Sequence, residues 1–259
     1  GALALTLNTT GTLNTAVGSL ALDANTTGNF NCGFGVHALG GNTTGNNNCA
    51  FGQSALITST SGLQNTAVGS QSLNSNTTAS NNTGIGFNAL GANTTGTLNT
   101  GVGSLALDAS TTGNHNTALG YGALSENTTA SLNTAVGSQV LDANTTGGSN
   151  TGVGHAALSA VTTCSNNTAV GKDAGLSITT GGDNTCIGVS ALITCQTGAS
   201  NTAVGVSAAR NCTGPSNTAI GHQNMNNLSS GGFNTGIGLN AGFTVTTGGN
   251  NFFGGFQAG

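Results

Sequence analysis

Charged side chains are nearly absent from this 259-residue chain, which has two Lys or Arg residues, six Asp or Glu residues and a formal net charge of −4. Lys172 and Arg210 are its only fixed cations. A nucleic-acid partner requires a basic stripe that neutralises phosphates, so this composition excludes one. The same lack of cations excludes a basic patch for a membrane surface.

Long apolar runs are also missing, because none approaches the roughly 18 residues that span a bilayer, and we expect no membrane insertion. Proline occurs once, and disordered chains usually combine low hydrophobicity with high charge or abundant proline. Here 36% of the residues are apolar, so we expect a folded chain. The sequence starts within a repeat, without an initiator Met or signal peptide, which suggests a processed chain or a segment of a longer one.

A short repeat dominates the sequence. Asn-Thr-Ala-Val-Gly returns with small variations in fifteen units, and thirteen of the fourteen intervals between unit starts are 17 residues long. Counted from its leading Asn, a unit reads Asn-Thr-Ala/Gly-Val/Ile-Gly at positions 1–5, Ala-Leu at 8–9 and Asn-Thr-Thr-Gly at 12–15. The units begin at Asn14, Asn31, Asn48, Asn65, Asn82, Asn99, Asn116, Asn133, Asn150, Asn167, Asn184, Asn201, Asn217, Asn234 and Asn251. A fixed short period indicates one structural unit stacked many times.

The repeat predicts an all-β fold, a parallel β-solenoid (β-roll) of about fifteen 17-residue coils. Seventeen residues are too few for a helix-turn-helix unit, and Val, Ile and Thr punctuated by Gly favour short strands and turns. We expect a single repeat domain over 1–259. Residues 1–13 form a partial first coil, 14–250 fourteen full coils and 251–259 a partial last coil.

The apolar positions suggest a thin core. Position 4, from Val17 to Ile237, is predicted to supply its main apolar ladder. Ala at position 8 and Leu at position 9 are adjacent, so in an extended strand they point to opposite faces. Either the Leu ladder faces outward and several stacks pack together, or a turn lets both residues point inward. Asn at position 1 is predicted to form a ladder in which each side-chain amide bonds to the next coil.

Units of the form Asn-Thr-Ala-Val-Gly-x-x-Ala-Leu resemble the Asn-Ser-Val-Ala-Ile-Gly coils of trimeric autotransporter adhesin heads. They are also similar to the Gly-rich repeats of phage and viral tail-fibre-like proteins. The resemblance covers essentially the whole chain and implies a trimeric parallel β-roll that projects from a surface and adheres. The unit here is a few residues longer than the adhesin coil, and no stalk, heptad repeat or membrane anchor is visible.

Cysteines recur at matching positions of adjacent units. Cys32 and Cys49 share position 2, and Cys195 and Cys212 share position 12. In-register stacking would place the Cα atoms of each pair about 4.8 Å apart, inside the disulfide range, so we predict two disulfides. The remaining cysteines form a weaker candidate pair, Cys164 and Cys186. Disulfides would place the protein outside the cell, whereas the alternative is that each Cys replaces Thr or Asn as a small buried residue.

Asn-X-Thr acceptors recur at position 12, where they would line one edge of the stack. The candidates for N-glycosylation are Asn8, Asn25, Asn42, Asn76, Asn93, Asn127 and Asn144. A chain rich in Asn and Thr also generates such acceptors by chance.

The sequence contains no recognisable catalytic constellation. His155 and His222 share position 6 but are four units apart, and no Ser or Cys has both a His and an acid partner. No Cys-x-x-Cys spacing indicates a metal site, and no Lys follows the glycines in phosphate-loop spacing. We expect a non-enzyme without cofactor or metal.

We predict a non-catalytic extracellular structural fibre or filament protein, which associates with itself as a lateral trimer or head to tail. The alternative is a receptor-binding segment of an adhesin or viral tail-fibre head on a cell or virion surface. Such a segment would bind a surface receptor or glycans through positions 10–17. A third hypothesis is ice binding, because Thr fills position 2 in twelve of fifteen units. Positions 13 and 14 offer no evident Thr-x-Thr array, because neighbouring residues alternate faces.

Overall fold

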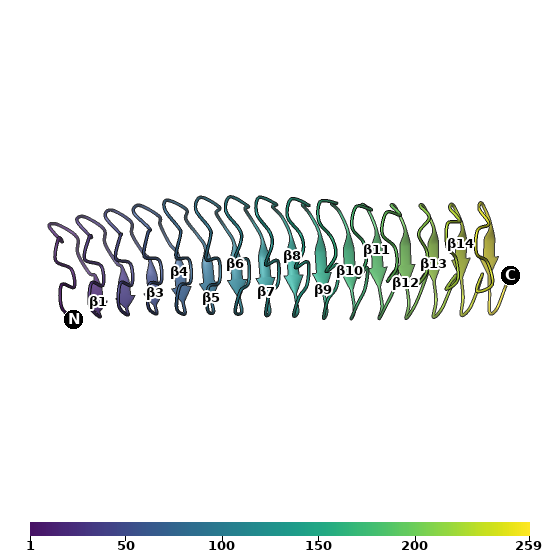
Figure 1. Ribbon diagram of the computed structural model, residues 1–259, viewed down its shortest axis with the longest axis horizontal. Helices are drawn as coiled ribbons and strands as arrows, with labels where there is room; N and C mark the ends of the chain where they lie inside the picture. Colours follow the sequence, from purple (N-terminus) through teal and green to yellow (C-terminus); the bar gives the residue numbers. More distant parts are fainter. The chain divides into compact units, whose positions relative to one another are not determined.

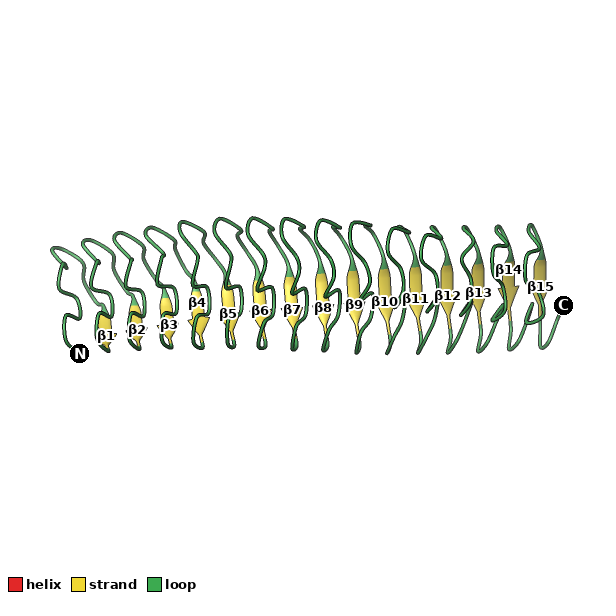
Figure 2. Ribbon diagram, in the orientation of Figure 1, coloured by secondary structure: helices red, strands yellow, loops and turns green.

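The computed structural model describes all 259 residues, and the chain divides into two compact units, Gly1–Ser131 and Leu132–Gly259. Each unit is a parallel β-solenoid in which every coil contributes one short strand and the rest of the coil is turns and loops (Figures 1 and 2). The predicted fold class is therefore confirmed. The structure contains no helix that could span a bilayer. The single domain over 1–259 stays a prediction.

Each unit contains strands of three residues that pair in parallel with their neighbours in sequence. The first unit holds β1 Thr15–Val17, β2 Cys32–Phe34, β3 Cys49–Phe51, β4 Thr66–Val68, β5 Thr83–Ile85, β6 Thr100–Val102 and β7 Thr117–Leu119. The second unit holds β8 Thr134–Val136, β9 Thr151–Val153, β10 Thr168–Val170, β11 Thr185–Ile187, β12 Thr202–Val204, β13 Thr218–Ile220, β14 Thr235–Ile237 and β15 Phe252–Gly254.

The strand register stacks equivalent positions into columns. Thr66 pairs with Thr83 and Val68 with Ile85, and the same alignment recurs along both units. The one short interval keeps this register, because Thr202 pairs with Thr218. The missing residue is therefore absorbed in the loop between the strands.

Glycine at position 5 ends each strand where no other residue fits. Gly103 has a φ of 134°, and a Cβ there would overlap the carbonyl oxygen of Gly120 in the next coil. Positions 7 and 9 also adopt a positive φ, with 60° at Leu105 and 55° at Leu107. A non-glycine residue in this region costs about 1–2 kcal/mol, which the packing of the stack has to offset.

These left-handed residues decide where the Leu ladder points. Ala106 and Leu107 are adjacent, yet both are 0% exposed, and the same holds for Ala191 and Leu192 in the second unit. Because the backbone turns at positions 7 and 9, neighbouring side chains do not alternate as they would in a strand. The inward arrangement is therefore correct. The outward Leu ladder is wrong, and the argument for packed stacks that depends on it no longer holds.

Asparagine at position 1 closes each coil and links it to the next. Nδ2 of Asn82 donates to the carbonyl oxygen of Gly96 in its own coil (2.8 Å), and its Oδ1 accepts from the backbone N–H of Asn99 in the following coil (2.9 Å). Asn184 repeats both bonds with Gly198 and Asn201 (2.9 Å each). The predicted ladder is confirmed, with a backbone N–H as its regular donor. These amides hold the turns of a coil in register without any charge.

Candidate functional site

The outward face of the sheet is formed by positions 2 and 4 of the strands, and we call it the outward sheet face. Its position-2 column contains Thr15, Cys32, Cys49, Thr66, Thr83, Thr100 and Thr117 in the first unit, and Thr134, Thr151, Thr168, Thr185, Thr202, Thr218, Thr235 and Phe252 in the second. Its position-4 column contains Val17, Phe34, Phe51, Val68, Ile85, Val102 and Leu119, then Val136, Val153, Val170, Ile187, Val204, Ile220, Ile237 and Gly254. No acidic or basic residue occurs in either column.

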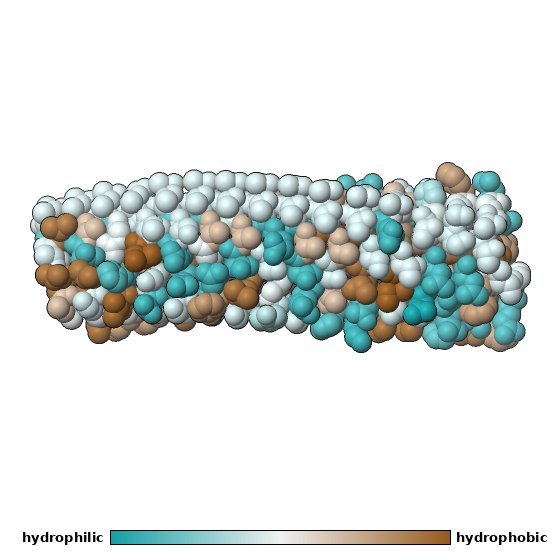
Figure 3. All heavy atoms as spheres, viewed as in Figure 1, coloured by the Kyte–Doolittle hydropathy of each residue, from teal (hydrophilic) through white to brown (hydrophobic).

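The prediction that position 4 supplies the main core ladder is wrong. Ala67 at position 3 is 0% exposed, whereas its neighbour Val68 at position 4 is 36% exposed. Nine position-4 side chains are between 36% and 51% exposed, because the pleat places them on the strand face opposite position 3. Apolar side chains therefore reach the surface among polar ones, as Figure 3 shows for one face. The restriction of position 3 mainly to Ala and Gly was the signal in the sequence that it faces a packed interior.

Threonines at position 2 and at position 13 differ in the hydrogen bonds that their hydroxyl groups make. The position-13 hydroxyl of Thr94 donates to the carbonyl oxygen of Thr111 in the next coil (3.0 Å), and Thr43 does the same to Thr60 (2.9 Å). The position-2 hydroxyls, such as those of Thr83 and Thr185, make no hydrogen bond within the protein. The outward sheet face therefore presents free hydroxyl groups beside exposed methyl groups.

All six cysteines are free thiols, so the predicted disulfides Cys32–Cys49 and Cys195–Cys212 and the weaker pair Cys164–Cys186 are absent. Side chains at equivalent positions of adjacent coils project in the same direction. Their Cβ atoms then stay near the strand spacing of about 4.8 Å, beyond the mean of about 3.8 Å for disulfides. The last pair occupies two different columns, positions 15 and 3.

The cysteine columns differ in exposure. Cys32 and Cys49 are half-buried on the outward sheet face, whereas Cys195 and Cys212 are fully buried. Burial, with the nearby Cys212 thiol as a smaller cause, raises the pKa of Cys195 to about 12. The buried cysteines thus behave as small interior residues, which is the alternative that the sequence left open.

The proposed row of glycosylation sites lies inside the protein. Six of its members are 0% exposed: Asn25, Asn42, Asn76, Asn93, Asn127 and Asn144. Nδ2 of Asn93, the atom that would carry a glycan, donates to the carbonyl oxygen of Gly96 and to Oδ1 of Asn76 (3.0 Å each). The placement on which the glycosylation prediction depended is therefore wrong, since a glycan does not fit on a buried amide. Asn8, in the partial first coil, is exposed.

Ionisable groups come together at one surface point. Asp173 lies 3.9 Å from Nδ1 of His155 and 3.6 Å from Nζ of Lys172, and both partners are more than half exposed. Exposed ion pairs of this kind contribute little to stability, typically about 0–1 kcal/mol. No group of three or more His, Cys, Asp or Glu side chains has a geometry that could hold a metal ion.

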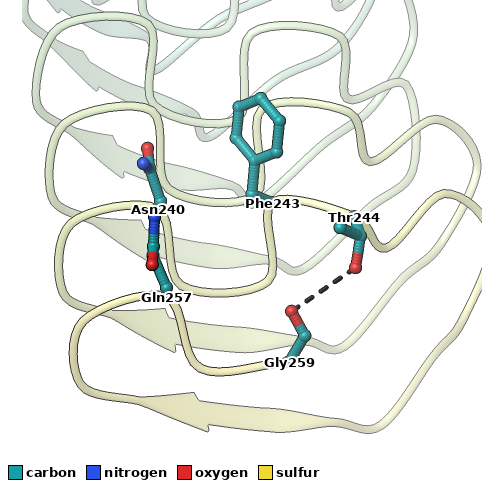
Figure 4. Close-up of a pocket in the computed structure, with 5 residues that line it drawn as sticks. All are labelled: Asn240, Phe243, Thr244, Gln257 and Gly259. Carbon is teal, nitrogen blue, oxygen red and sulfur yellow. Dashed lines mark hydrogen bonds between the residues drawn. The ribbon is translucent and has the colours of Figure 1, made fainter.

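A small pocket of about 250 Å³ lies beside the last coil (Figure 4). It is lined by Asn240, Phe243, Thr244, Gln257 and Gly259, none of which has an ionisable side chain. Thr244 donates a long hydrogen bond to the carbonyl oxygen of Gly259 across it (3.4 Å).

Comparison of the chain with family models, with curated proteins and with solved structures finds no match. The outward sheet face is therefore the candidate functional surface on physical grounds alone. Its two columns recur in nearly every coil of both units.

Proposed function

We propose that this chain is a non-catalytic structural protein that assembles laterally with further copies of itself through the outward sheet face. The observation that carries this proposal is the in-register column of exposed apolar side chains at position 4. A location outside the cell, on a cell or virion surface, is supported by the resemblance to adhesin and tail-fibre repeats. The free thiols remove the argument from disulfides.

Burial of position 4 provides the driving force for assembly. Val17, Leu119 and Ile237 are 51%, 48% and 46% exposed, although they are apolar. Removing apolar surface from water contributes about 25 cal/mol per Å². Each half-exposed side chain adds little, but the same contact recurs in nearly every coil, so the contributions accumulate along a stack. An uncharged face also brings no like charges together when two copies meet.

A second copy fits this face better than an unrelated partner. Its columns repeat at the strand spacing of about 4.8 Å, and another copy has the same period. Identical β-branched side chains can therefore interdigitate along the whole contact, as they do between the paired sheets of steric zippers. A partner without that period would match the columns in a few places only.

The test compares two pairs of lysine substitutions in the second unit. Val136→Lys with Val170→Lys places two charges on the outward sheet face. The matched control, Thr146→Lys with Thr180→Lys, places them two coils apart at position 14, which is exposed on another side of the coil. We expect the wild type and the control to assemble in light scattering and electron microscopy, and the face variant to stay monomeric.

A monomeric wild type would overturn the proposal. Discrete trimers that resist the face variant would instead favour the adhesin or tail-fibre segment, and a search for a receptor or glycan would follow.

Ice binding is a second candidate function. The observation that favours it is the column of position-2 hydroxyls that make no hydrogen bond within the protein. Thr83 and Ile85 both face outward, so each strand presents a hydroxyl and an apolar side chain two residues apart. This array of Thr at position 2 and an apolar residue at position 4 would take the role of a Thr-x-Thr array, which positions 13 and 14 do not form. Wild-type protein should then slow ice growth, and Thr83→Lys with Thr100→Lys should abolish the effect. Absence of any effect of the wild type would exclude this candidate.

A further inference from the structure

Two adjacent strands break the pattern of the outward sheet face. Position 2 is Thr in twelve of the fifteen strands and position 4 is aliphatic in twelve. β2 and β3 depart at both positions at once, with Cys32 and Phe34 on one strand and Cys49 and Phe51 on the other. We call these four residues the Cys–Phe patch. It is the only place where two consecutive coils change both columns together.

The Cys–Phe patch is a continuous surface element. Cys32 pairs in register with Cys49, and Phe34 with Phe51. The two phenyl rings are stacked, with centroids 4.8 Å apart and planes within 6° of parallel. Phe51 is 40% exposed. Burial, with the nearby Cys32 thiol as a smaller cause, raises the pKa of Cys49. A phenyl ring is also larger than the Val and Ile side chains that most strands carry at this position.

A regular face cannot by itself specify how two copies align. Sliding one copy by a whole coil restores nearly the same contacts, so lateral packing through identical columns has many registers of similar energy. A single irregular element removes this degeneracy. Two Cys–Phe patches that meet gather all four rings in one aromatic contact, whereas copies in any other register place the rings of each copy against Thr and Val columns at two separate sites.

We propose that the Cys–Phe patch sets the register of lateral assembly by packing against the same patch of a second copy. This inference rests on the proposed function. The second copy is the occupant because the patch carries no charge and lies on the same outward sheet face through which we propose that copies assemble. A two-fold contact is self-complementary, so each copy supplies and receives the same groups.

Disulfide trapping tests the alignment. Copies labelled with ¹⁴N and ¹⁵N are mixed, assembled and treated with oxidised glutathione. Two protein thiols lose their protons and two electrons to form one disulfide, and one glutathione disulfide is reduced to two thiols. Mass spectrometry of digested covalent dimers identifies the linked peptides. We expect mixed-isotope links confined to the patch, joining Cys32 to Cys49 if the copies are antiparallel, and like to like if they are parallel.

Two matched variants separate alignment from thiol chemistry. Phe34→Val with Phe51→Val keeps both thiols but removes the rings, and Val is the residue that equivalent coils carry. In the second variant, Cys32→Thr and Cys49→Thr are combined with Thr134→Cys and Thr151→Cys, which moves the thiol pair to β8 and β9 in the same register. Both should assemble as the wild type does. The variant without the rings should give about a tenfold lower yield of covalent dimer, the ratio expected for a loss of about 1.4 kcal/mol in alignment. The relocated thiols should give an equally low yield if the copies are antiparallel about the patch, and should link like to like if the copies are parallel and in register.

The outcomes distinguish the two proposals. A wild type that stays monomeric in light scattering overturns the proposed function. If the wild type assembles but the variant without the rings traps covalent dimers as efficiently, the register proposal is overturned while lateral assembly stands. Links within one copy instead of between copies also overturn it.

Discussion

Position 12 is buried in both units, yet the two units fill it with opposite chemistry. In the first unit the fully buried column is polar and contains Asn25, Asn42, Ser59, Asn76, Asn93, Ser110 and Asn127. In the second unit Asn144 is followed by fully buried residues of apolar character, namely Val161, Ile178, Cys195, Cys212 and Leu228. The same coil therefore accepts either kind of interior.

The polar column is tolerated because its amides are hydrogen-bonded. Nδ2 of Asn42 donates to Oδ1 of Asn25 (2.8 Å) and to the carbonyl oxygen of Gly45 (3.1 Å). A buried polar group costs free energy unless it has such partners, whereas an apolar side chain needs none. The conformation of the coil therefore does not depend on whether position 12 is polar or apolar. Asn at position 1 and Gly at position 5 recur in every coil of both units and determine that conformation instead.

Substitution of the position-5 glycine should have the largest effect, and it should be equal in the two units. Gly69→Ala and Gly188→Ala each place a Cβ against the backbone of the next coil at φ near 130°. We expect each to lower the free energy of unfolding by about 3 kcal/mol or more, measured by urea denaturation. Gly122→Ala is the control, because that glycine has open space around it, and it should cost about 1 kcal/mol. Unequal losses at Gly69 and Gly188 would contradict a shared role.

Ile178→Asn transfers the polar chemistry of the first unit into the apolar column of the second. Its neighbours there are Val161 and Cys195, so the new amide would gain no ladder partner. We expect a loss of about 3 kcal/mol from lost apolar burial and an amide that lacks its bonds to the neighbouring coils. Ile178→Val should cost about 1 kcal/mol. A cost of Ile178→Asn close to that of Ile178→Val would show that the column accepts an isolated amide.

Alkaline pH should destabilise the second unit. Burial raises the pKa of Cys195 from 9.0 to about 12, and it also raises the pKa of Cys186 and Cys212. Above pH 9.0 the unfolded chain ionises these thiols while the folded unit keeps them protonated, so stability falls as the pH rises from 9.0 towards 12.

Val161 shows that valine already occupies this column. Cys195→Val with Cys212→Val should therefore reduce the loss of stability at alkaline pH, measured by thermal melting on either side of pH 9.0. An unchanged alkaline loss in that variant would assign the effect to other groups.

Repair of the polar ladder should have the smallest effect, a gain. Ser59 interrupts the column, and its Oγ and the Oδ1 of Asn42 are buried without a hydrogen-bond partner. Ser59→Asn would supply an amide to Asn42 and raise the free energy of unfolding by about 1 kcal/mol. Ser61→Asn, at an exposed position of the same coil, should change it little. Equal effects of the two substitutions in urea denaturation would argue against the repair.

Much of the fold could be predicted because its signals are local and repeated. The 17-residue period, the leading Asn and the invariant Gly predicted stacked coils and an amide ladder, and both are present. The inward direction of Leu107 could not be predicted, because a left-handed Leu is rare and nothing in its side chain announces it. Position 4 was expected in the core but faces outward, and position 3 faces the interior instead. This was missed because hydrophobicity favours Val over Ala or Gly as a core residue.

The errors about single residues share one cause. Asn93 was expected to line one edge of the stack and is buried, and Cys32 and Cys49 were expected to bridge and are free. Adjacency in a repeat says which residues stack, but not which way a column faces or how its side chains are oriented. The outward sheet face, on which the proposed function depends, could be recognised only once the structure showed which way each column faces.

The sequence by itself determined the period, the parallel register and the low charge of this protein, because each follows from residue types at fixed spacing. The tertiary structure decided which columns are inside. That choice depends on left-handed turns at positions 7 and 9, which are stable only when neighbouring coils pack against them. A coil in isolation has no neighbour to offset their cost, so its inside and outside are defined by the stack and not by the unit.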